Sequence, residues 1–230
     1  MSACNGFVTP TASYLFTDAA VCDPNTFKVL AFLSKVAHIP HCGAAISATG
    51  NAMVTSLFGS TLAQRDLRDF DDLVSQSLDA LQKCIRDVEA LPGATKHVFE
   101  NFRIGIAGWS PKANAPAFYS IQSNDGIGIK PFELLSCDKF INPAASHEND
   151  RSIIDLNFEP KRPAESGLAI VRAQRKMKCG QYYAVGGWAQ MTTVTRDGIS
   201  TRILEKWPDK IGQRIVPTAP VPGSLFSAST

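Results

Sequence analysis

The sequence carries little net charge. Its 230 residues include 23 Lys or Arg and 21 Asp or Glu, so the formal net charge is +2. A nucleic-acid-binding domain usually concentrates basic residues in a patch or along one helix. The tightest basic run here, RAQRKMKC at residues 172–179, has the spacing of a solvent-exposed helix face rather than of a binding patch. We therefore expect no nucleic-acid partner.

Long apolar runs are also missing. No stretch approaches the ~20 apolar residues that cross a bilayer, and the first ten residues, MSACNGFVTP, lack the basic start and apolar middle of a signal peptide. The six cysteines include no C-x-x-C pair, which is typical of reduced thiols in a cytoplasm-like compartment. His38 and His41 are close in sequence, but the proline between them argues against zinc. The sequence thus predicts a cytoplasmic protein with no membrane segment, metal or cofactor.

Short strands occupy the first fifty residues. The segments ACNGFVT and SYLFTDAA flank a turn at residues 9–12 and predict a hairpin. KVLAFLSKV follows a second turn, and GAAISATG is a small apolar strand that ends at Gly50. Two opposite charges interrupt this apolar region, Asp18 at the end of one strand and Lys35 in the next. Charged side chains are rarely buried without a partner, so each of these two residues needs an explanation.

Two helices are predicted further along the chain. Residues 69–91 repeat apolar side chains at steps of three and four, and acidic residues load the first turn. A second helix, AESGLAIVRAQRKMKC, opens after Pro163 and ends at Gly180. The remaining strands are FRIGIAGWS, APAFYSIQS, YYAVGGWAQMTTVT and ISTRILEKW, with residues 130–155 irregular. The glycine pair at 186–187 indicates a bulge or a close approach of strands.

Clustered strands with long helices favour an α+β fold, in which two sheets are layered and helices lie outside, over an alternating parallel sheet. We find no internal repeat or linker and assign residues 1–215 to a single domain. Residues 216–230 are rich in Pro, Ser and Thr and are predicted to form a tail.

Several of these segments, in this order, resemble the proteasome β-subunit branch of the N-terminal nucleophile (Ntn) hydrolases. In that family a strand ends in Thr-Asp-small-small, a lysine follows in the next strand, and a small-small-Gly strand end leads into a helix. The matching segments here are FTDAA, SKVAHIP and AAISATGNA, followed by the similar GIAGWSPKANAPAFYSIQSNDG. The resemblance covers residues 1–128 and extends to the helix at 164–178. It implies a four-layer αββα sandwich.

The resemblance also implies a catalytic set made of Ser2, Asp18, Lys35 and Gly50. The family's nucleophile is the first residue of the mature chain and precedes the aspartate by sixteen residues, which places Ser2 there once Met1 is removed. The α-amine of Ser2 would be the base, since such amines titrate near ~7.7–8.0. Lys35 would favour the deprotonated hydroxyl, and Asp18 would orient Lys35. The backbone N–H of Gly50 would stabilise the oxyanion.

Other interpretations of these residues stay open. Asp18 and Lys35 can equally form a structural ion pair, which costs ~3–5 kcal/mol to break. The family also places an aspartate and a serine after its late helix, whereas KMKCGQYYAVGG has neither. Ser166 and Asp197 are candidates for these places only by residue type. Cys4 is a rival nucleophile that would require cleavage directly before it.

The sequence therefore predicts a proteasome-like hydrolase of amide bonds, with peptides as one substrate class. The alternative is a catalytically inactive relative with a structural or assembly role. Relatives in this branch form rings, so the resemblance also implies a homo-oligomer.

Overall fold

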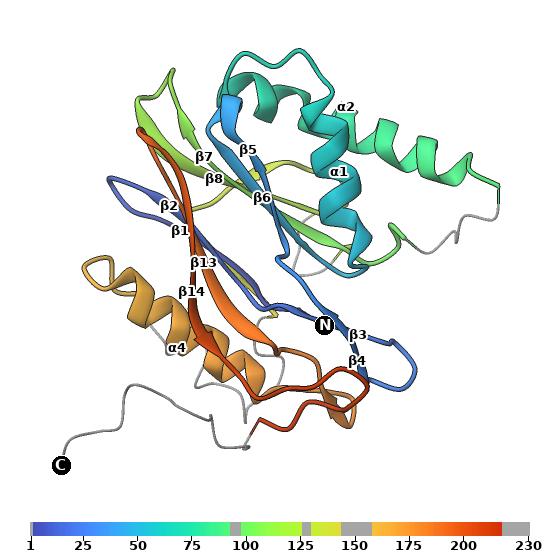
Figure 1. Ribbon diagram of the computed structural model, residues 1–230. Coiled ribbons are helices and arrows are strands. Elements are labelled where there is room, and N and C mark those ends of the chain that lie inside the picture. The colour runs from blue at the N-terminus through green and yellow to red at the C-terminus, as the bar shows by residue number, and fades with distance from the viewer. Residues whose placement is uncertain (1, 93–97, 126–129, 144–157, 218–230) are drawn as a thin grey trace.

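The computed structural model describes residues 2–92, 98–125, 130–143 and 158–217. Two five-stranded antiparallel sheets are stacked, and helices cover both outer sides (Figure 1). The predicted α+β fold and four-layer αββα sandwich are therefore confirmed. Most of the predicted tail, residues 218–230, lies outside the described residues.

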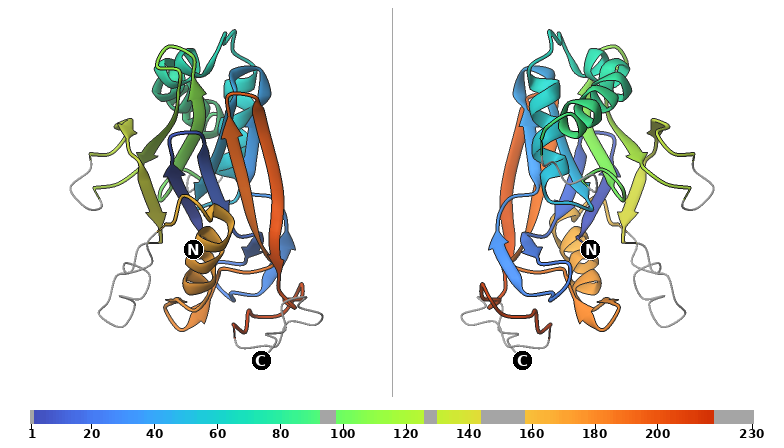
Figure 2. Two further views of the ribbon diagram at one scale, coloured as in Figure 1. Left: turned by 90° about the vertical axis from the view of Figure 1, so that its left-hand side faces the viewer. Right: turned by 90° about the vertical axis from the view of Figure 1, so that its right-hand side faces the viewer.

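Each sheet combines strands from distant parts of the chain. The first sheet contains, in spatial order, β10 (Lys139–Asn142), β1 (Cys4–Val8), β2 (Ser13–Thr17), β13 (Trp188–Thr195) and β14 (Gly198–Lys206). The second contains β5 (Val36–Ile39), β6 (Ala44–Thr49), β7 (Arg103–Ser110), β8 (Ala115–Gln122) and β9 (Leu135–Ser136). Two small hairpins pair β3 (Ala20–Cys22) with β4 (Val29–Phe32), and β11 (Lys178–Cys179) with β12 (Tyr182–Tyr183). Figure 2 shows β13 and β14 as a long hairpin along one side of the molecule.

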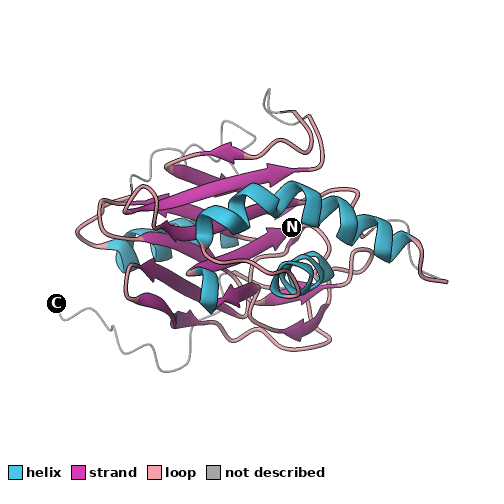
Figure 3. Cartoon of the chain, turned by 90° about the horizontal axis from the view of Figure 1, so that it is seen from above, coloured by secondary structure: helices cyan, strands magenta, loops and turns pink. Residues whose placement is uncertain are grey.

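Helices α1 (Met53–Ala63) and α2 (Phe70–Glu89) cover the second sheet, as the view from above shows (Figure 3). Helix α2 begins as predicted, because the Asp69 side chain accepts a hydrogen bond from the N–H of Asp72 at 2.9 Å. Its apolar face packs on the sheet in a cluster that includes Phe58, Leu73 and Ile104. Burial of this face fixes the helix against the sheet.

Two further apolar layers complete the sandwich. Leu15 and Phe118 belong to a cluster formed between the two sheets. Phe16, the next residue after Leu15, points the other way and packs with Ile170 of helix α4 (Pro163–Arg175). This alternation along β2 buries the strand on both faces, so all five of its residues are buried.

The structure corrects the sequence prediction at several places. The predicted strand YYAVGGWAQMTTVT is divided into β12 and β13, with residues 184–187 between them. The segment read as irregular contains β9 and β10, and β10 pairs with the edge of β1. Helix α4 ends at Arg175 rather than near Gly180, because the chain there turns into the β11–β12 hairpin. The strand around Lys35 is interrupted after Phe32, so Lys35 lies in the connection from β4 to β5. That connection carries the chain from the small hairpin to the second sheet.

Within the described ranges, none of the helices combines the length and the apolar character that crossing a membrane would require.

Candidate active site

The β1–β2 hairpin brings Ser2 and Asp18 together. Cys4 pairs with Thr17 in this hairpin, so the residues just beyond the paired ends are neighbours in space. The N–H of Ala3 donates to Asp18 Oδ1 at 2.9 Å, and both residues are buried. The hairpin thus fixes the start of the described chain beside a buried carboxylate.

Lys35 joins this pair from the connection before β5. Its Nζ lies 2.7 Å from Asp18 Oδ1 and 2.9 Å from Ser2 Oγ. Lys35 is 6% exposed and Asp18 is fully buried. The structure therefore brings three of the predicted site residues into one hydrogen-bonded chain, in which the ammonium group of Lys35 donates both to the carboxylate and to the hydroxyl.

The second oxygen of Asp18 is held by the backbone. Asp18 Oδ2 accepts hydrogen bonds from the N–H of Ala20 at 3.2 Å and of Gly186 at 3.0 Å. With Ala3 and Lys35, the carboxylate has four donors, which come from positions 3, 20, 35 and 186 of the chain. Such a carboxylate acts as a fixed acceptor that sets the direction of Lys35.

Ser2 and Lys35 open onto a cleft of about 510 Å³. Gly50 also lines it, so all the predicted site residues except the fully buried Asp18 reach the same space. The apolar part of the lining includes Val21, Phe27 and Leu30. A concave site with mainly apolar walls and a few polar groups at one place is typical of a small-molecule or peptide site.

Gly50 occupies a position that no other residue fits well. Its φ is +105°, and a Cβ atom there would lie 2.1 Å from the carbonyl oxygen of Asn101. Both the backbone conformation and the close approach therefore require glycine. Gly50 follows β6 and precedes α1, as the sequence predicted.

The rival candidates lie elsewhere. Cys4 is fully buried, and this burial raises the pKa of its thiol to about 12, so it is a poor nucleophile near neutral pH. Ser166 donates to the carbonyl of Arg162 at the start of α4, and Asp197 is exposed in the β13–β14 turn. Neither belongs to the cleft.

The contact of Gly186 with Asp18 was not predicted. The sequence shows a glycine pair at 186–187, but nothing in it connects that pair to Asp18, which lies 168 residues away. A buried ion pair directly behind these glycines, Arg175 with Asp209, was also missed. The described residues contain no group of three or more His, Cys, Asp or Glu side chains arranged to hold a metal ion.

Comparisons with known proteins agree with this fold. The structure is similar to the Gly-1 mutant of Anbu from Hyphomicrobium sp. strain MC1, a protein with a proteasome-like Ntn-hydrolase fold. The two share 13% sequence identity over 89% of this chain and 88% of that chain, with a TM-score of 0.60. At this identity the likeness establishes the fold alone. No protein-family model and no curated protein sequence matches the chain.

Proposed function

We propose that this protein is an N-terminal serine hydrolase that cleaves amide bonds, with Ser2 as its nucleophile after removal of Met1. The observation that carries the proposal is the placement of Lys35 Nζ, 2.9 Å from Ser2 Oγ and 2.7 Å from Asp18, beside an open cleft. A buried ion pair that served stability alone would not need a donor directed at a hydroxyl in a cleft. The proteasome-like fold supports the same chemistry.

In the proposed reaction, the Oγ of Ser2 attacks the carbonyl carbon of the substrate. The free α-amine of Ser2 accepts the hydroxyl proton, directly or through a water molecule. It then delivers that proton to the leaving amine as the C–N bond breaks, which leaves an ester on Ser2. Water hydrolyses the ester, with the same amine as base, and restores the hydroxyl.

Lys35 acts in this scheme as a fixed positive charge. One N–H of its ammonium group donates to Asp18, and a second N–H can stabilise the oxygen of Ser2 as negative charge develops there. Two unit charges 4 Å apart interact by about 4 kcal/mol at the effective dielectric constant of a protein surface. The same positive charge favours the neutral, basic form of the nearby amine.

Gly50 is proposed to stabilise the oxyanion of the tetrahedral intermediate with its backbone N–H. Its place on the cleft wall and the absence of a side chain allow the substrate carbonyl to approach the backbone there. The apolar walls near Phe27 and Leu30 favour a substrate with an apolar group, such as a peptide segment. The resemblance to the proteasome branch also supports self-association into a homo-oligomer.

One observation favours the alternative, a catalytically inactive relative with an assembly role. Residues 176–187, which follow α4, contain no carboxylate that could orient the amine of Ser2. In that case the Asp18–Lys35 pair would preserve the shape of the cleft without chemistry.

Intact mass and covalent labelling separate the two functions. Intact mass of protein from its native host first shows whether Met1 is removed, since a chain that keeps Met1 has no free Ser2 amine. A serine-reactive electrophile such as a β-lactone should then add one label to the wild-type protein and none to Ser2→Ala. Ser34→Ala is the matched control, because Ser34 is an exposed serine next to Lys35 in sequence. Absence of labelling in a chain that lacks Met1 would favour the inactive relative.

A further inference from the structure

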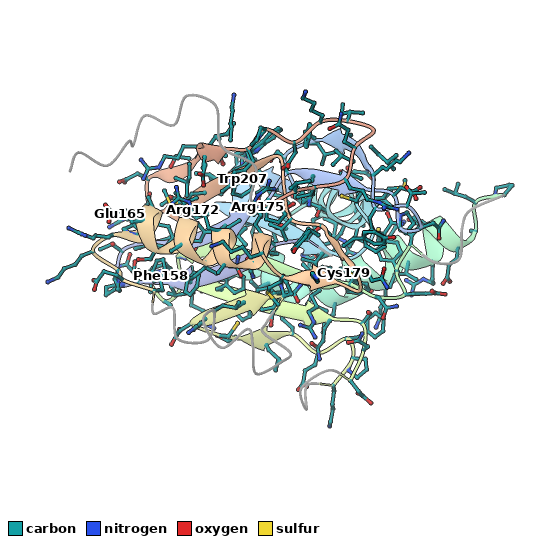
Figure 4. All side chains as sticks on the ribbon, turned by 90° about the horizontal axis from the view of Figure 1, so that it is seen from below. Phe158, Glu165, Arg172, Arg175, Cys179 and Trp207 are labelled. Carbon is teal, nitrogen blue, oxygen red and sulfur yellow. The ribbon has the colours of Figure 1, made fainter. Side chains whose placement is uncertain are left out.

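A second buried ion pair lies behind the candidate site. Arg175, the last residue of α4, contacts Asp209 through two parallel hydrogen bonds of 2.7 and 2.8 Å. Both side chains are only 4% exposed. The guanidinium group also lies over the ring of Trp207, 4.6 Å from its centroid. Figure 4 shows Arg175 on α4 beside Trp207, with Arg172 about one turn earlier on the helix.

This pair holds the backbone on both sides of Gly186. Arg175 Nη1 donates to the carbonyl of Val185 at 3.0 Å, and Asp209 Oδ2 accepts from the N–H of Gly187 at 2.8 Å. The residue between them, Gly186, donates its N–H to Asp18 Oδ2 at 3.0 Å. The ion pair thus fixes Val185 and Gly187, the two neighbours of Gly186, and the N–H of Gly186 in turn binds Asp18.

Gly186 packs directly against the ion pair, with no room for a side chain between them. A Cβ atom on Gly186 would lie 2.6 Å from Asp209 Oδ2 and 3.0 Å from Arg175 Nη1. On its other side the carbonyl of Gly186 accepts hydrogen bonds from the N–H groups of Ala19 and Ala20, each at 3.0 Å. Gly186 is therefore clamped between the ion pair and the backbone that follows Asp18.

Stability alone does not explain an ion pair at this place. Replacing a buried ion pair by well-packed apolar side chains is often neutral or stabilising, because the desolvation of two charges offsets their attraction. What apolar side chains cannot supply is a donor for the carbonyl of Val185 and an acceptor for the N–H of Gly187. These two contacts set the position of the peptide group that faces Asp18.

We propose that Arg175 and Asp209 are positioning residues of the candidate active site. They fix Gly186 so that its N–H holds Asp18, and Asp18 in turn directs Lys35 at Ser2. The inference rests on the proposed function for its effect on reactivity, while the positioning of Gly186 is independent of it. Neither residue lines the cleft or contacts Ser2.

The sequence offers a selective probe of this contact. Gly186 is the only one of the 16 glycines that follows a valine. Protein labelled with ¹³C-carbonyl valine and ¹⁵N-glycine therefore gives a single ¹³C–¹⁵N correlated amide signal, that of Gly186. An N–H bonded to a carboxylate resonates downfield, and its shift reports the Gly186–Asp18 hydrogen bond. Asp18→Asn provides the reference position for a weakened bond.

The test compares Arg175→Met/Asp209→Leu, which removes both charges, with Arg172→Met. Arg172, on the same helix as Arg175, makes a similar two-bonded pair with Glu205 of β14, but its side chain is 53% exposed. We expect the Gly186 signal to move toward the Asp18→Asn position in the double variant and to stay in place in Arg172→Met. The rate constant for acylation of Ser2 should fall ~10- to 100-fold with little change in electrophile affinity, since a small displacement of a reacting group has effects of this size.

An unchanged Gly186 signal in the folded double variant would overturn the proposal, and so would a wild-type rate of acylation. If the double variant does not fold, Arg175→Lys takes its place, because it keeps the charge but loses the two parallel bonds. If the wild-type protein itself is not labelled, the proposed function fails while the Gly186 signal still decides whether the ion pair positions Asp18.

Discussion

Two ion pairs in the described part of the chain are almost fully buried, and they differ in their cation and in what that cation contacts. Asp18–Lys35 and Asp209–Arg175 each contain a carboxylate oxygen 2.7 Å from a cationic nitrogen, and all four side chains are at most 6% exposed. Lys35 directs a further donor at the hydroxyl of Ser2 in the cleft, whereas Arg175 directs its donors at Asp209 and at the carbonyl of Val185. The first pair therefore lies beside the cleft, and the second contacts only other parts of the protein.

The type of cation matches each setting. A lysine ammonium is a compact charge with three donors, which suits contact with both a carboxylate and a hydroxyl. The planar arginine fork suits a fixed structural contact with a carboxylate, and here it also lies over an aromatic ring. Burial and pairing are common to both pairs, so they do not single out the candidate site. What distinguishes it is the donor that Lys35 directs at the hydroxyl of Ser2.

The largest effect is expected when Asp18 is removed from the first pair. Asp18→Ala leaves buried Lys35 without its carboxylate partner and leaves the N–H groups of Ala3 and Gly186 without their acceptor, whereas the N–H of Ala20 keeps the carbonyl of Gly186. We expect a loss of ~3–5 kcal/mol in the free energy of unfolding, measured by urea denaturation. Asp197→Ala, at an exposed turn, should change it by less than ~0.5 kcal/mol. Similar values for the two variants would contradict the role of Asp18 as a shared acceptor.

The second pair should be nearly as costly to break from one side. Arg175→Met leaves the carboxylate of Asp209 buried and unpaired, so we expect a loss of ~3–5 kcal/mol in the free energy of unfolding. The exposed pair of Arg172 with Glu205 should contribute only ~0–1 kcal/mol, which Arg172→Met measures. Equal costs for the two arginines would show that burial does not distinguish these pairs.

A substitution at Gly50 tests the wall of the cleft that Ser2 and Lys35 also line. Gly50→Ala forces a side chain into a φ of +105° and against the carbonyl of Asn101, so we expect a loss of ~1–3 kcal/mol and slower labelling of Ser2. Gly43 also has a positive φ, +59°, but has open space around it. Gly43→Ala should therefore cost less and leave the labelling rate unchanged. Equal costs would mean that the approach to Asn101 is not tight.

The smallest effect concerns two cysteines near the first pair that differ in burial. Cys22 lines the cleft, while Cys4 is buried with a thiol pKa of about 12. Because the Cys4 thiol is buried and its pKa is raised, iodoacetamide should leave it unmodified in the folded protein. Burial also raises the pKa of Cys22, and its modification should become faster as the pH rises. Mass spectrometry of the digested protein measures both, and early modification of Cys4 would contradict its burial.

Much of the fold followed from local patterns. The turn at residues 9–12 between two short strand segments predicted the first hairpin, and the spacing of apolar residues with an acidic first turn predicted α2. The strand β10 was missed because four residues among irregular sequence carry too little periodicity. Its existence depends on pairing with β1, a contact about 135 residues away in the chain.

The candidate site likewise has a part that the sequence predicted and a part that it did not. Ser2, Asp18, Lys35 and Gly50 were found by the resemblance of short segments near the start of the chain, and the structure places three of them in one hydrogen-bonded chain. The support from Gly186 and the Arg175–Asp209 pair could not be predicted. These contacts join residues from distant segments, and only the folded sandwich brings them to the back of Asp18.

The most direct test of the central claim is the rate at which a serine-reactive electrophile acylates Ser2 in Lys35→Met. Lys28→Met is the matched control, because Lys28 is an exposed lysine on the β3–β4 hairpin. If the charge of Lys35 activates Ser2, the acylation rate should fall ~100- to 1,000-fold in Lys35→Met and stay at the wild-type value in Lys28→Met. Acylation of Ser2 at the wild-type rate in folded Lys35→Met would contradict the account.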